Sequence, residues 1–167
     1  QVTPDSALSA LVARAVRTTD SLANRIITDI ALPLPRTGNQ YPLGNLIADA
    51  FRNVLRTDVA LVNNGGVRAD VAAGRLTYGQ LFTVMPFQNQ AVTVTLTGKQ
   101  LREVAEASIT AGGPDAHVSG MRITYDLSRP AGQRVREIRL ANGKKPKDTG
   151  RYTLAVNSFL AAGQSGC

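Results

Sequence analysis

The sequence predicts a mixed α/β (α+β) fold, in which helices cover a mixed sheet and the chain closes with an antiparallel group of strands. Two patterns carry this prediction. Between residues 3 and 109, apolar residues at helical spacing alternate with short β-rich runs, and from Met121 onward apolar and polar residues alternate as in half-buried strands. The length of 167 residues suits about one domain, and 43% hydrophobic residues is ordinary for a globular protein. Helices that cover one sheet would satisfy both patterns.

The first element expected is a helix that begins at Thr3 and Pro4 and runs to about Asn24. Threonine is a good N-cap, and proline fits the first helical position. The apolar residues that then recur at helical spacing are Leu8, Leu11, Val12, Ala15 and Val16. Residues 26–34 are β-rich, and Pro33 and Pro35 mark the end of this segment, which predicts an edge or exit segment. A loop follows at 36–42.

The clearest helix covers residues 43–56, and a buried strand follows at 59–62. The strand is predicted because its four residues form a short, continuous run that is apolar and β-prone. The helix is predicted because it has a continuous apolar stripe, made of Leu43, Leu46, Ile47, Ala50, Phe51, Val54 and Leu55.

A short helix at 78–84 and a strand at 91–96 come next. Thr97 and Gln100 have the spacing of a capping box, so another helix is expected to start there. The residues of this helix that we expect to face inward are Leu101, Val104, Ala105 and Ile109.

The rest of the chain is predicted to be a loop followed by antiparallel strands. The loop is expected from Ala111 to Ser119. The alternating apolar residues of the strands are Met121, Ile123 and Tyr125, then Ile138 and Leu140, then Tyr152, Leu154 and Val156. Asn142 and Gly143 form a turn signal between the last two segments.

The charge of the chain is compatible with an anionic ligand. The formal net charge is +7, and 15 of the 19 basic residues are arginine, which suits bidentate binding of phosphate or carboxylate. A solvated basic surface is the simpler explanation. The one dense basic run, at residues 144–147, has the form of a hairpin tip, and no aromatic-basic RNA signature accompanies it. We therefore expect no nucleic-acid partner.

Composition excludes several classes of site. Cys167 is the only cysteine, so the chain has no disulfide framework and no cysteine-rich zinc site. His117 is the only histidine, whereas hydrolytic metal centres usually draw on several His and Asp side chains. We therefore expect no metal site and no catalytic residue in this chain. No segment approaches the ~18 apolar residues of a membrane span.

One motif stands out, the segment Asn-Asn-Gly-Gly-Val-Arg at residues 63–68, directly after the predicted buried strand. Ligands of α/β sheets bind outside the carboxyl ends of strands. The two glycines allow a sharp turn and a close approach, while Asn63 and Arg68 offer an amide and a guanidinium. A plain turn explains the hexapeptide equally well, because Asn-Gly is a common turn dipeptide.

Further ligand-type residues lie in other predicted loops. Arg36 precedes the clearest helix, Phe87 and Asn89 follow a proline, Gly113 belongs to a glycine pair, and Phe159 follows the last strand. Arginine forks bind phosphate, and an aromatic face stacks on a nucleobase at ~1–3 kcal/mol. Taken singly, each phenylalanine would more often be a core residue and Arg36 a solvated charge.

These motifs, in this order, resemble the C-terminal domain of the 5′-nucleotidases, a family that includes periplasmic UDP-sugar hydrolase and ecto-5′-nucleotidase. The resemblance covers nearly the whole chain. The segments that carry it are residues 43–50, 63–68, 85–87, 125–130 and 158–161.

The resemblance implies how a nucleotide base would be bound. Phe87 and Phe159 would sandwich the base. Asn89 and the backbone at Gly113 would contact its edges, and Asn63 would contact the base or the sugar.

It also implies phosphate and ribose contacts. Arg36 and Arg68 would hold the phosphate. Ser165 stands where the family has an acid that contacts the ribose hydroxyls, and a serine lacks the charge-assisted strength of a carboxylate.

The resemblance further implies a two-domain parent. Residues 1–25 would be a connecting helix from an N-terminal metallophosphoesterase domain, and residues 26–167 would be the nucleotide-binding domain. The N-terminal domain would carry two divalent metal ions and hydrolyse nucleotide phosphate esters, so this chain alone is expected to be inactive. The family implies a periplasmic, extracellular or cell-surface location.

Two other functions fit the same residues. The chain could be a stand-alone, non-catalytic nucleotide-binding module, or its parent could act on 2′,3′-cyclic nucleotides or UDP-sugars. The sequence leaves these open, because the reacting group would be handled by the N-terminal domain.

Overall fold

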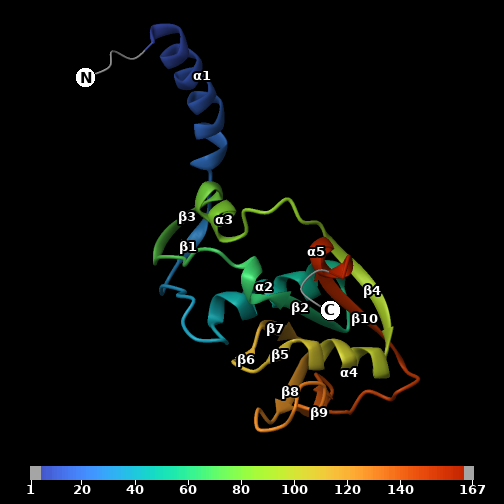
Figure 1. Cartoon of the computed structure of the whole chain (residues 1–167). Coiled ribbons are helices and arrows are strands. Elements are labelled where there is room, and N and C mark those ends of the chain that lie inside the picture. The colour runs from blue at the N-terminus through green and yellow to red at the C-terminus, as the bar shows by residue number, and fades with distance from the viewer. Residues whose placement is uncertain (1–4, 164–167) are drawn as a thin grey trace. The chain divides into compact units, whose positions relative to one another are not determined.

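The computed structural model describes residues 5–163, with the backbone alone at residues 17 and 18. The chain folds into two compact units (Figure 1). The smaller unit is formed from residues 1–34 and 68–86, and the larger one from residues 35–67 and 87–167.

The smaller unit combines two helices with a two-stranded sheet. Its elements are α1 (Ser6–Ala23), β1 (Ile26–Ile30), β3 (Gly74–Thr77) and α3 (Tyr78–Val84). Strands β1 and β3 pair antiparallel. The predicted helix at 78–84 is confirmed, and Thr77 and Gln80 close a capping box at its start. Strand β3 escaped prediction because it is short and buries a single side chain, that of Leu76.

Helix α1 presents an apolar stripe that the described residues leave exposed. The helix begins at Ser6, where the Asp5 carboxylate accepts hydrogen bonds from the first turn, and it ends at Ala23, close to the predicted end at about Asn24. The predicted start at Thr3 and Pro4 lies outside the described residues. The predicted stripe residues Leu8, Leu11, Val12 and Val16 are between 48% and 69% exposed.

The larger unit is built on a four-stranded sheet. Its strand order is β4 (Ala91–Thr97), β10 (Arg151–Asn157), β2 (Val59–Asn63) and β7 (Ala116–Ser119). Strand β10 runs antiparallel to β4 and parallel to β2, and β7 runs antiparallel to β2. The sheet is therefore mixed, as the sequence predicts.

The central strand β2 is buried on both faces of the sheet. Val59 and Leu61 of β2 join the core cluster together with Leu101 and Ala105 of α4 (Gly98–Ala107). The alternate residues of β2, at 60 and 62, are also fully buried, and α2 (Pro42–Leu55) packs against this strand. The predicted strand and both predicted helices are thus confirmed, and so is the capping box of Thr97 and Gln100.

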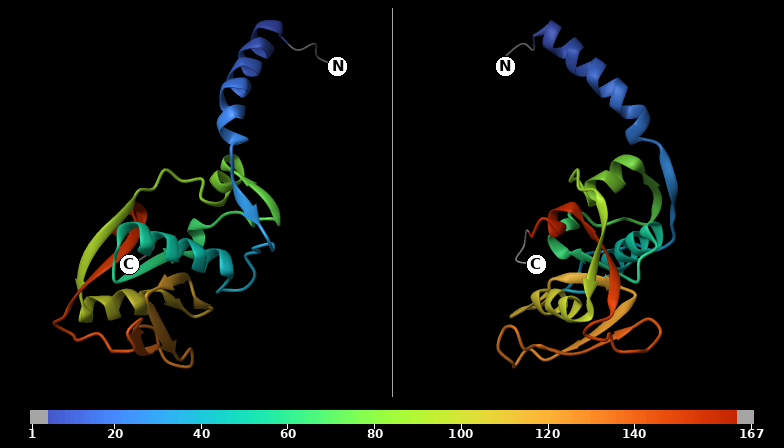
Figure 2. Two further views of the ribbon diagram at one scale, coloured as in Figure 1. Left: turned by 180° about the vertical axis from the view of Figure 1, so that it is seen from behind. Right: turned by 90° about the vertical axis from the view of Figure 1, so that its right-hand side faces the viewer.

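An antiparallel hairpin lies next to α4. It consists of β8 (Met121–Tyr125) and β9 (Val135–Leu140). Figures 1 and 2 show α4 between the four-stranded sheet and this hairpin, in agreement with its contacts to β4, β9 and β10. The remaining elements are η1 (Asn64–Gly66), β5 (Ile109–Thr110), β6 (Gly113–Pro114) and α5 (Ser158–Ala161).

The loop predicted at Ala111–Ser119 is wrong, because β6 and β7 lie within it. Strand β7 carries two polar side chains, His117 and Ser119, that are buried because they are hydrogen bonded. The His117 ring bonds to the Asn45 amide, and the Ser119 hydroxyl donates to the Asp49 carboxylate. These bonds allow polar side chains to be buried in β7. The strand therefore lacks the apolar pattern by which it could have been recognised in the sequence.

Two further predictions are corrected. Strand β10 does not pair with β9 across the Asn142–Gly143 turn, but lies inside the main sheet. Ile109, predicted on a helix, lies in β5.

The buried face of α2 is rotated from the predicted stripe. Leu46 and Val54 are exposed, whereas Leu43, Gly44 and Ala48 are buried. The reason is steric: the His117 ring occupies the space that a side chain at position 44 would fill.

Candidate functional site

A cavity of about 300 Å³ opens in the larger unit at the ends of the two inner strands of its sheet. The parallel strands β2 and β10 end there, at Asn63 and Asn157. The carboxyl ends of parallel strands are the usual place for a ligand in an α/β sheet. The residues that line the cavity are Asn63, Gly65, Gly66, Phe87, Asn89, Asn157 and Phe159.

The cavity brings together four of the residues singled out from the sequence, namely Asn63, Phe87, Asn89 and Phe159. Phe87 is 48% exposed and Phe159 is 40% exposed, so neither ring belongs to the hydrophobic core. Two exposed aromatic rings beside amide groups form a surface that is apolar in its walls and able to hydrogen bond at its edges.

Asn157 forms a buried polar link between two parts of the cavity. Its side-chain nitrogen donates to Asn63 Oδ1 at 3.1 Å, and its side-chain oxygen accepts from the Leu160 N–H at 2.9 Å. The second bond caps α5, the short helix that carries Phe159. Sequence analysis missed Asn157, although an asparagine directly before a short apolar segment is a recognisable helix N-cap.

The glycine pair forms the 3₁₀ turn η1 directly after β2. Gly66 is buried, and a Cβ there would lie 3.0 Å from Asn63 Oδ1. Gly66 therefore lets the backbone lie close to the amide of Asn63. Asn64 is used differently, because its amide donates to the Asn39 and Pro114 carbonyls and so ties neighbouring loops together.

The segment that carries Phe87 and Asn89 is fastened to α5. The Gln90 N–H donates to Ser158 Oγ at 3.1 Å, and the Ser158 N–H donates to the Gln90 carbonyl at 2.8 Å. Since Ser158 is the first residue of α5, these bonds fix the segment with Phe87 relative to the helix with Phe159.

The other predicted site residues are not among those that line the cavity. The exposed Arg36 donates from Nη1 to the Val67 carbonyl at 2.7 Å. Arg68 follows Val67 in the chain, belongs to the smaller unit, and donates its N–H to the Val84 carbonyl. Gly113 lies in β6 with φ at +108°, and its carbonyl accepts from the Thr110 hydroxyl. Ser165 lies outside the described residues.

His117 has a structural environment. It is fully buried, with Nδ1 3.0 Å from Asn45 Oδ1, and burial lowers its pKa from the ordinary value. Within residues 5–163, no group of three or more His, Cys, Asp or Glu side chains is placed to hold a metal ion. No helix in that same range is long and apolar enough to cross a membrane.

An α/β domain with an aromatic, amide-lined cavity at the carboxyl ends of its strands is of the class that binds small ligands. Comparison with known families makes the assignment specific. The family model for the 5′-nucleotidase C-terminal domain matches residues 14–167, and the chain therefore belongs to this family. The family predicted from the sequence is confirmed.

Individual relatives agree with this assignment. The trifunctional nucleotide phosphoesterase protein YfkN of Bacillus subtilis (strain 168) is 35% identical over 156 residues, which cover 83% of this chain and 10% of that protein. The endonuclease YhcR of the same strain is 33% identical over 165 residues, covering 96% of this chain and 13% of that protein.

A solved relative has the same fold. The crystal structure of a 5′-nucleotidase precursor from Thermus thermophilus superposes with a TM-score of 0.83 at 29% identity. The match covers 98% of this chain and 36% of that chain. The chain thus spans from about a tenth to about a third of the length of these relatives.

Proposed function

We propose that this chain is the nucleotide-binding domain of a secreted 5′-nucleotidase-type metallophosphoesterase that hydrolyses nucleotide phosphate esters. The observation that carries the proposal is the cavity in which Phe87 and Phe159 occur together with Asn63 and Asn89. Membership of the 5′-nucleotidase family supports it.

In this proposal the cavity takes the nucleoside part of the substrate. The rings of Phe87 and Phe159 stack on the base, and the amides of Asn63 and Asn89 bond to its edges or to the sugar. The exposure of both rings supports this role, because a ring already packed in the core could not stack on a ligand. The backbone at Gly113 and the hydroxyl of Ser165 are proposed as further contacts to base and ribose.

Arg36 and Arg68 are proposed to bind the phosphate, which a guanidinium can do with two parallel hydrogen bonds. Arg36 is already oriented by its bond to the Val67 carbonyl, next in sequence to Arg68. Phosphate and base contacts would together orient the ester for attack, and binding energy remote from the reacting bond serves this purpose.

The chemical step is assigned to a partner domain of the same polypeptide. Residues 1–25 would connect the nucleotide-binding domain, residues 26–167, to an N-terminal metallophosphoesterase domain. That domain would supply two divalent metal ions, which activate water as a nucleophile. The exposed apolar stripe of α1 supports such a neighbour, because it would be covered by contact with another domain.

The first test is the substitution Phe159→Ala. Loss of one stacking surface should weaken adenosine binding by about 1–3 kcal/mol, or roughly 5- to 150-fold, measured by calorimetry. Phe82→Ala is the matched control, because Phe82 is also an exposed phenylalanine but lies in α3, outside the cavity. Unchanged affinity of the Phe159 variant would remove the aromatic clamp.

The second test concerns the phosphate. Arg68→Ala should weaken AMP binding by at least about tenfold and adenosine binding far less, because only AMP offers a charged partner to the guanidinium. Arg75→Ala, which removes another exposed arginine of the same unit, should leave both affinities unchanged. Equal losses for AMP and adenosine in the Arg68 variant would contradict the assignment.

A further inference from the structure

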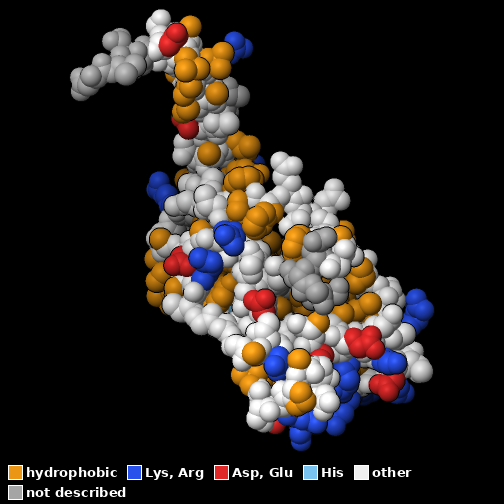
Figure 3. All heavy atoms as spheres, in the orientation of Figure 1, with side chains coloured by type: hydrophobic (Ala, Val, Ile, Leu, Met, Phe, Trp, Pro, Cys, Tyr) orange, Lys and Arg blue, Asp and Glu red, His pale blue; other side chains and the backbone are white. Residues whose placement is uncertain are grey.

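The larger unit has a second cavity, of about 430 Å³, that shares no lining residue with the first. It lies where the end of α2, the turn between β7 and β8, and the end of β9 meet. Three of its lining residues are arginines, Arg52, Arg122 and Arg139. Figure 3 shows Lys and Arg side chains gathered over the part of the surface where β8 and β9 lie.

Two of these arginines occupy an unfavourable register. Arg122 of β8 and Arg139 of β9 are directly opposite in the antiparallel pair, and both are exposed. Opposite residues have Cβ atoms only about 4.5–5.5 Å apart, so like charges there are destabilising. An anion bound between the two guanidinium groups would relieve this repulsion.

The two charges are not equally compensated. Arg139 forms a bidentate pair with the Glu137 carboxylate, at 2.8 and 3.1 Å, and its Nη1 donates to the Gly143 carbonyl. Glu137 is also paired with Lys145. The Arg122 side chain, by contrast, has no ion pair or hydrogen bond with any residue in the described part of the chain, and its charge is unneutralised.

Arg52 reaches the same cavity from the last turn of α2. Its Nε donates to the Asp58 carbonyl at 3.0 Å, which fixes the plane of the guanidinium. Gly120 makes room for it, because a Cβ at this position would lie 2.6 Å from Arg52 Nε. The Gly120 carbonyl accepts a hydrogen bond from the N–H of Ala141, the residue directly after β9.

The charge of the lining fits a doubly charged anion. Against the three arginines stands one acid, Asp49, whose carboxylate already accepts the Ser119 hydroxyl at 2.5 Å. Arginine forks recognise the oxygens of a phosphate group with parallel hydrogen bonds. The volume also suits a small ligand, because such pockets are typically about 300–1,000 Å³.

We propose that this cavity binds a phosphate dianion, either free or as the monoester group of a small molecule. Arg122 and Arg52 hold its oxygens, and the anion separates the charges of Arg122 and Arg139. The site is distinct from the nucleotide cavity, so it stands whether or not the proposed function is correct.

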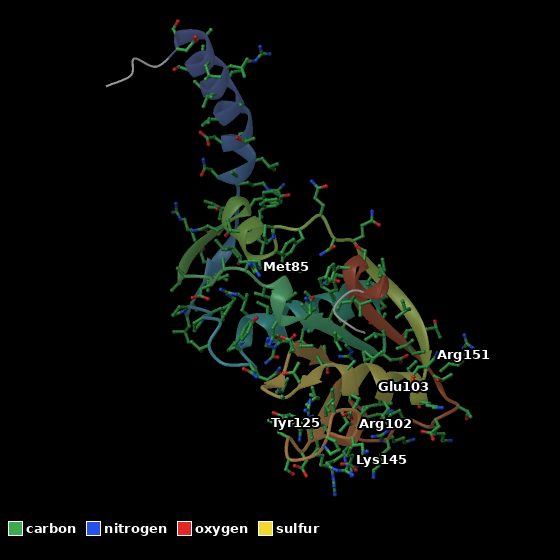
Figure 4. The ribbon with its side chains drawn as sticks, in the orientation of Figure 1. Met85, Arg102, Glu103, Tyr125, Lys145 and Arg151 are labelled. Atoms are coloured by element: carbon green, nitrogen blue, oxygen red, sulfur yellow. The ribbon has the colours of Figure 1, made fainter. Side chains whose placement is uncertain are left out.

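The test is titration of the 167-residue chain with inorganic phosphate, followed by calorimetry and by thermal unfolding, at ionic strength held constant with chloride. Arg122→Gln should weaken phosphate binding by at least about tenfold. Arg151→Gln is the control, because Arg151, labelled in Figure 4, is exposed at the start of β10 and outside the cavity. Equal loss in both variants would overturn the site.

Relief of repulsion adds a signature that a merely structural arginine would not give. Without phosphate, Arg122→Gln should melt no lower than the wild type, because a like-charge pair has been removed. At saturating phosphate, the wild type should melt at a higher temperature than the Arg122→Gln variant. A variant that melts lower under both conditions would overturn the proposal.

Two further measurements separate this site from the proposed nucleotide site. In the unmodified chain, phosphate should shift the Nε–Hε NMR signals of Arg52 and Arg122 saturably, whereas equal shifts with chloride would contradict a specific site. Arg68→Ala should leave this response intact, and its loss in that variant alone would assign phosphate to the nucleotide site. AMP added to the Phe159→Ala variant shows whether a monoester binds as free phosphate does.

Discussion

At the scale of the residue, His117 determines how two elements of the larger unit meet. Its ring packs edge-on against Tyr41, with centroids 4.2 Å apart, and bonds through Nδ1 to Asn45. Gly44 lacks the Cβ that would collide with the ring. The Nε2 atom is buried and has no hydrogen-bond partner in the described part of the chain. Burial therefore lowers the pKa of this ring and favours its neutral form.

This environment predicts a specific pH dependence of stability. Burial lowers the pKa of His117 in the folded chain below 6.5, so below that pH the unfolded chain binds a proton that the folded chain does not. The contribution of His117 to the free energy of unfolding should be fully present above pH 6.5 and should be lost as the pH falls below 6.5. The slope from this group is at most about 1.4 kcal/mol per pH unit. Urea unfolding between about pH 7.5 and about pH 5.5 measures it.

His117→Asn is the informative variant for this dependence. The side-chain nitrogen of asparagine is attached to Cγ like the histidine Nδ1, so it retains an N–H for the Asn45 oxygen, but it does not titrate. Its unfolding free energy should therefore vary less over the same range than that of the wild type. Identical pH profiles for the two proteins would assign the dependence to other groups.

At the scale of the element, α5 depends on its surroundings. It has four residues, Ser158–Ala161, which is too short for a helix that is stable by itself. The Asn157 cap and the bonds between Ser158 and Gln90 hold it in place. The position of Phe159 is therefore set by a few hydrogen bonds at the carboxyl end of β10.

Asn157→Ala should accordingly affect both stability and binding. Loss of the cap, together with the unpaired amide left at Asn63, should cost about 1–2 kcal/mol of stability, and adenosine affinity should fall as α5 shifts. Thr97→Ala is a matched control, because Thr97 caps α4 and lies outside the cavity. It should lower stability, measured by urea unfolding, without changing adenosine affinity. Equal effects of both variants on affinity would mean that α5 does not position Phe159.

Elements with strong local signals were predictable from the sequence, and elements defined by distant partners were not. The helix after Thr97 follows from helical spacing and a capping box, which involve neighbours in sequence, and the short helix at 78–84 was also predicted. Strand β10 pairs with β4 and with β2, far away in the chain, and no local pattern encodes that choice. Strand β7 was hidden because its buried side chains include polar ones.

The same distinction applies to the cavity. Asn63, Phe87, Asn89 and Phe159 could be singled out because their motifs resemble those of a known family, and the fold brings them together. Asn157 has an ordinary helix-capping role in the sequence, and its bond to Asn63 becomes visible only when β2 and β10 are known to be neighbours. Arg122 and Arg139 likewise become a pair only through the register of their hairpin.

At the scale of the whole molecule, the chain has an aromatic, amide-lined cavity and an apolar helix face that the described residues leave exposed. The cavity lies entirely within the larger unit, whereas the α1 stripe belongs to the smaller one. These features suit a division of labour in which one part of a polypeptide captures a ligand and another part performs the chemistry. The coverage of the relatives is compatible with this, because each extends well beyond the matched region.

This division of labour predicts that the chain binds nucleotides without hydrolysing them. Supplied with Mn²⁺ or Zn²⁺, it should release no phosphate from AMP above background, because the proposed metal ligands belong to the N-terminal domain. Calorimetry on the same sample provides the control, since AMP binding would demonstrate a folded and competent cavity. Metal-dependent release of phosphate that Phe159→Ala reduces would contradict the proposal, because it would locate the reaction inside these 167 residues.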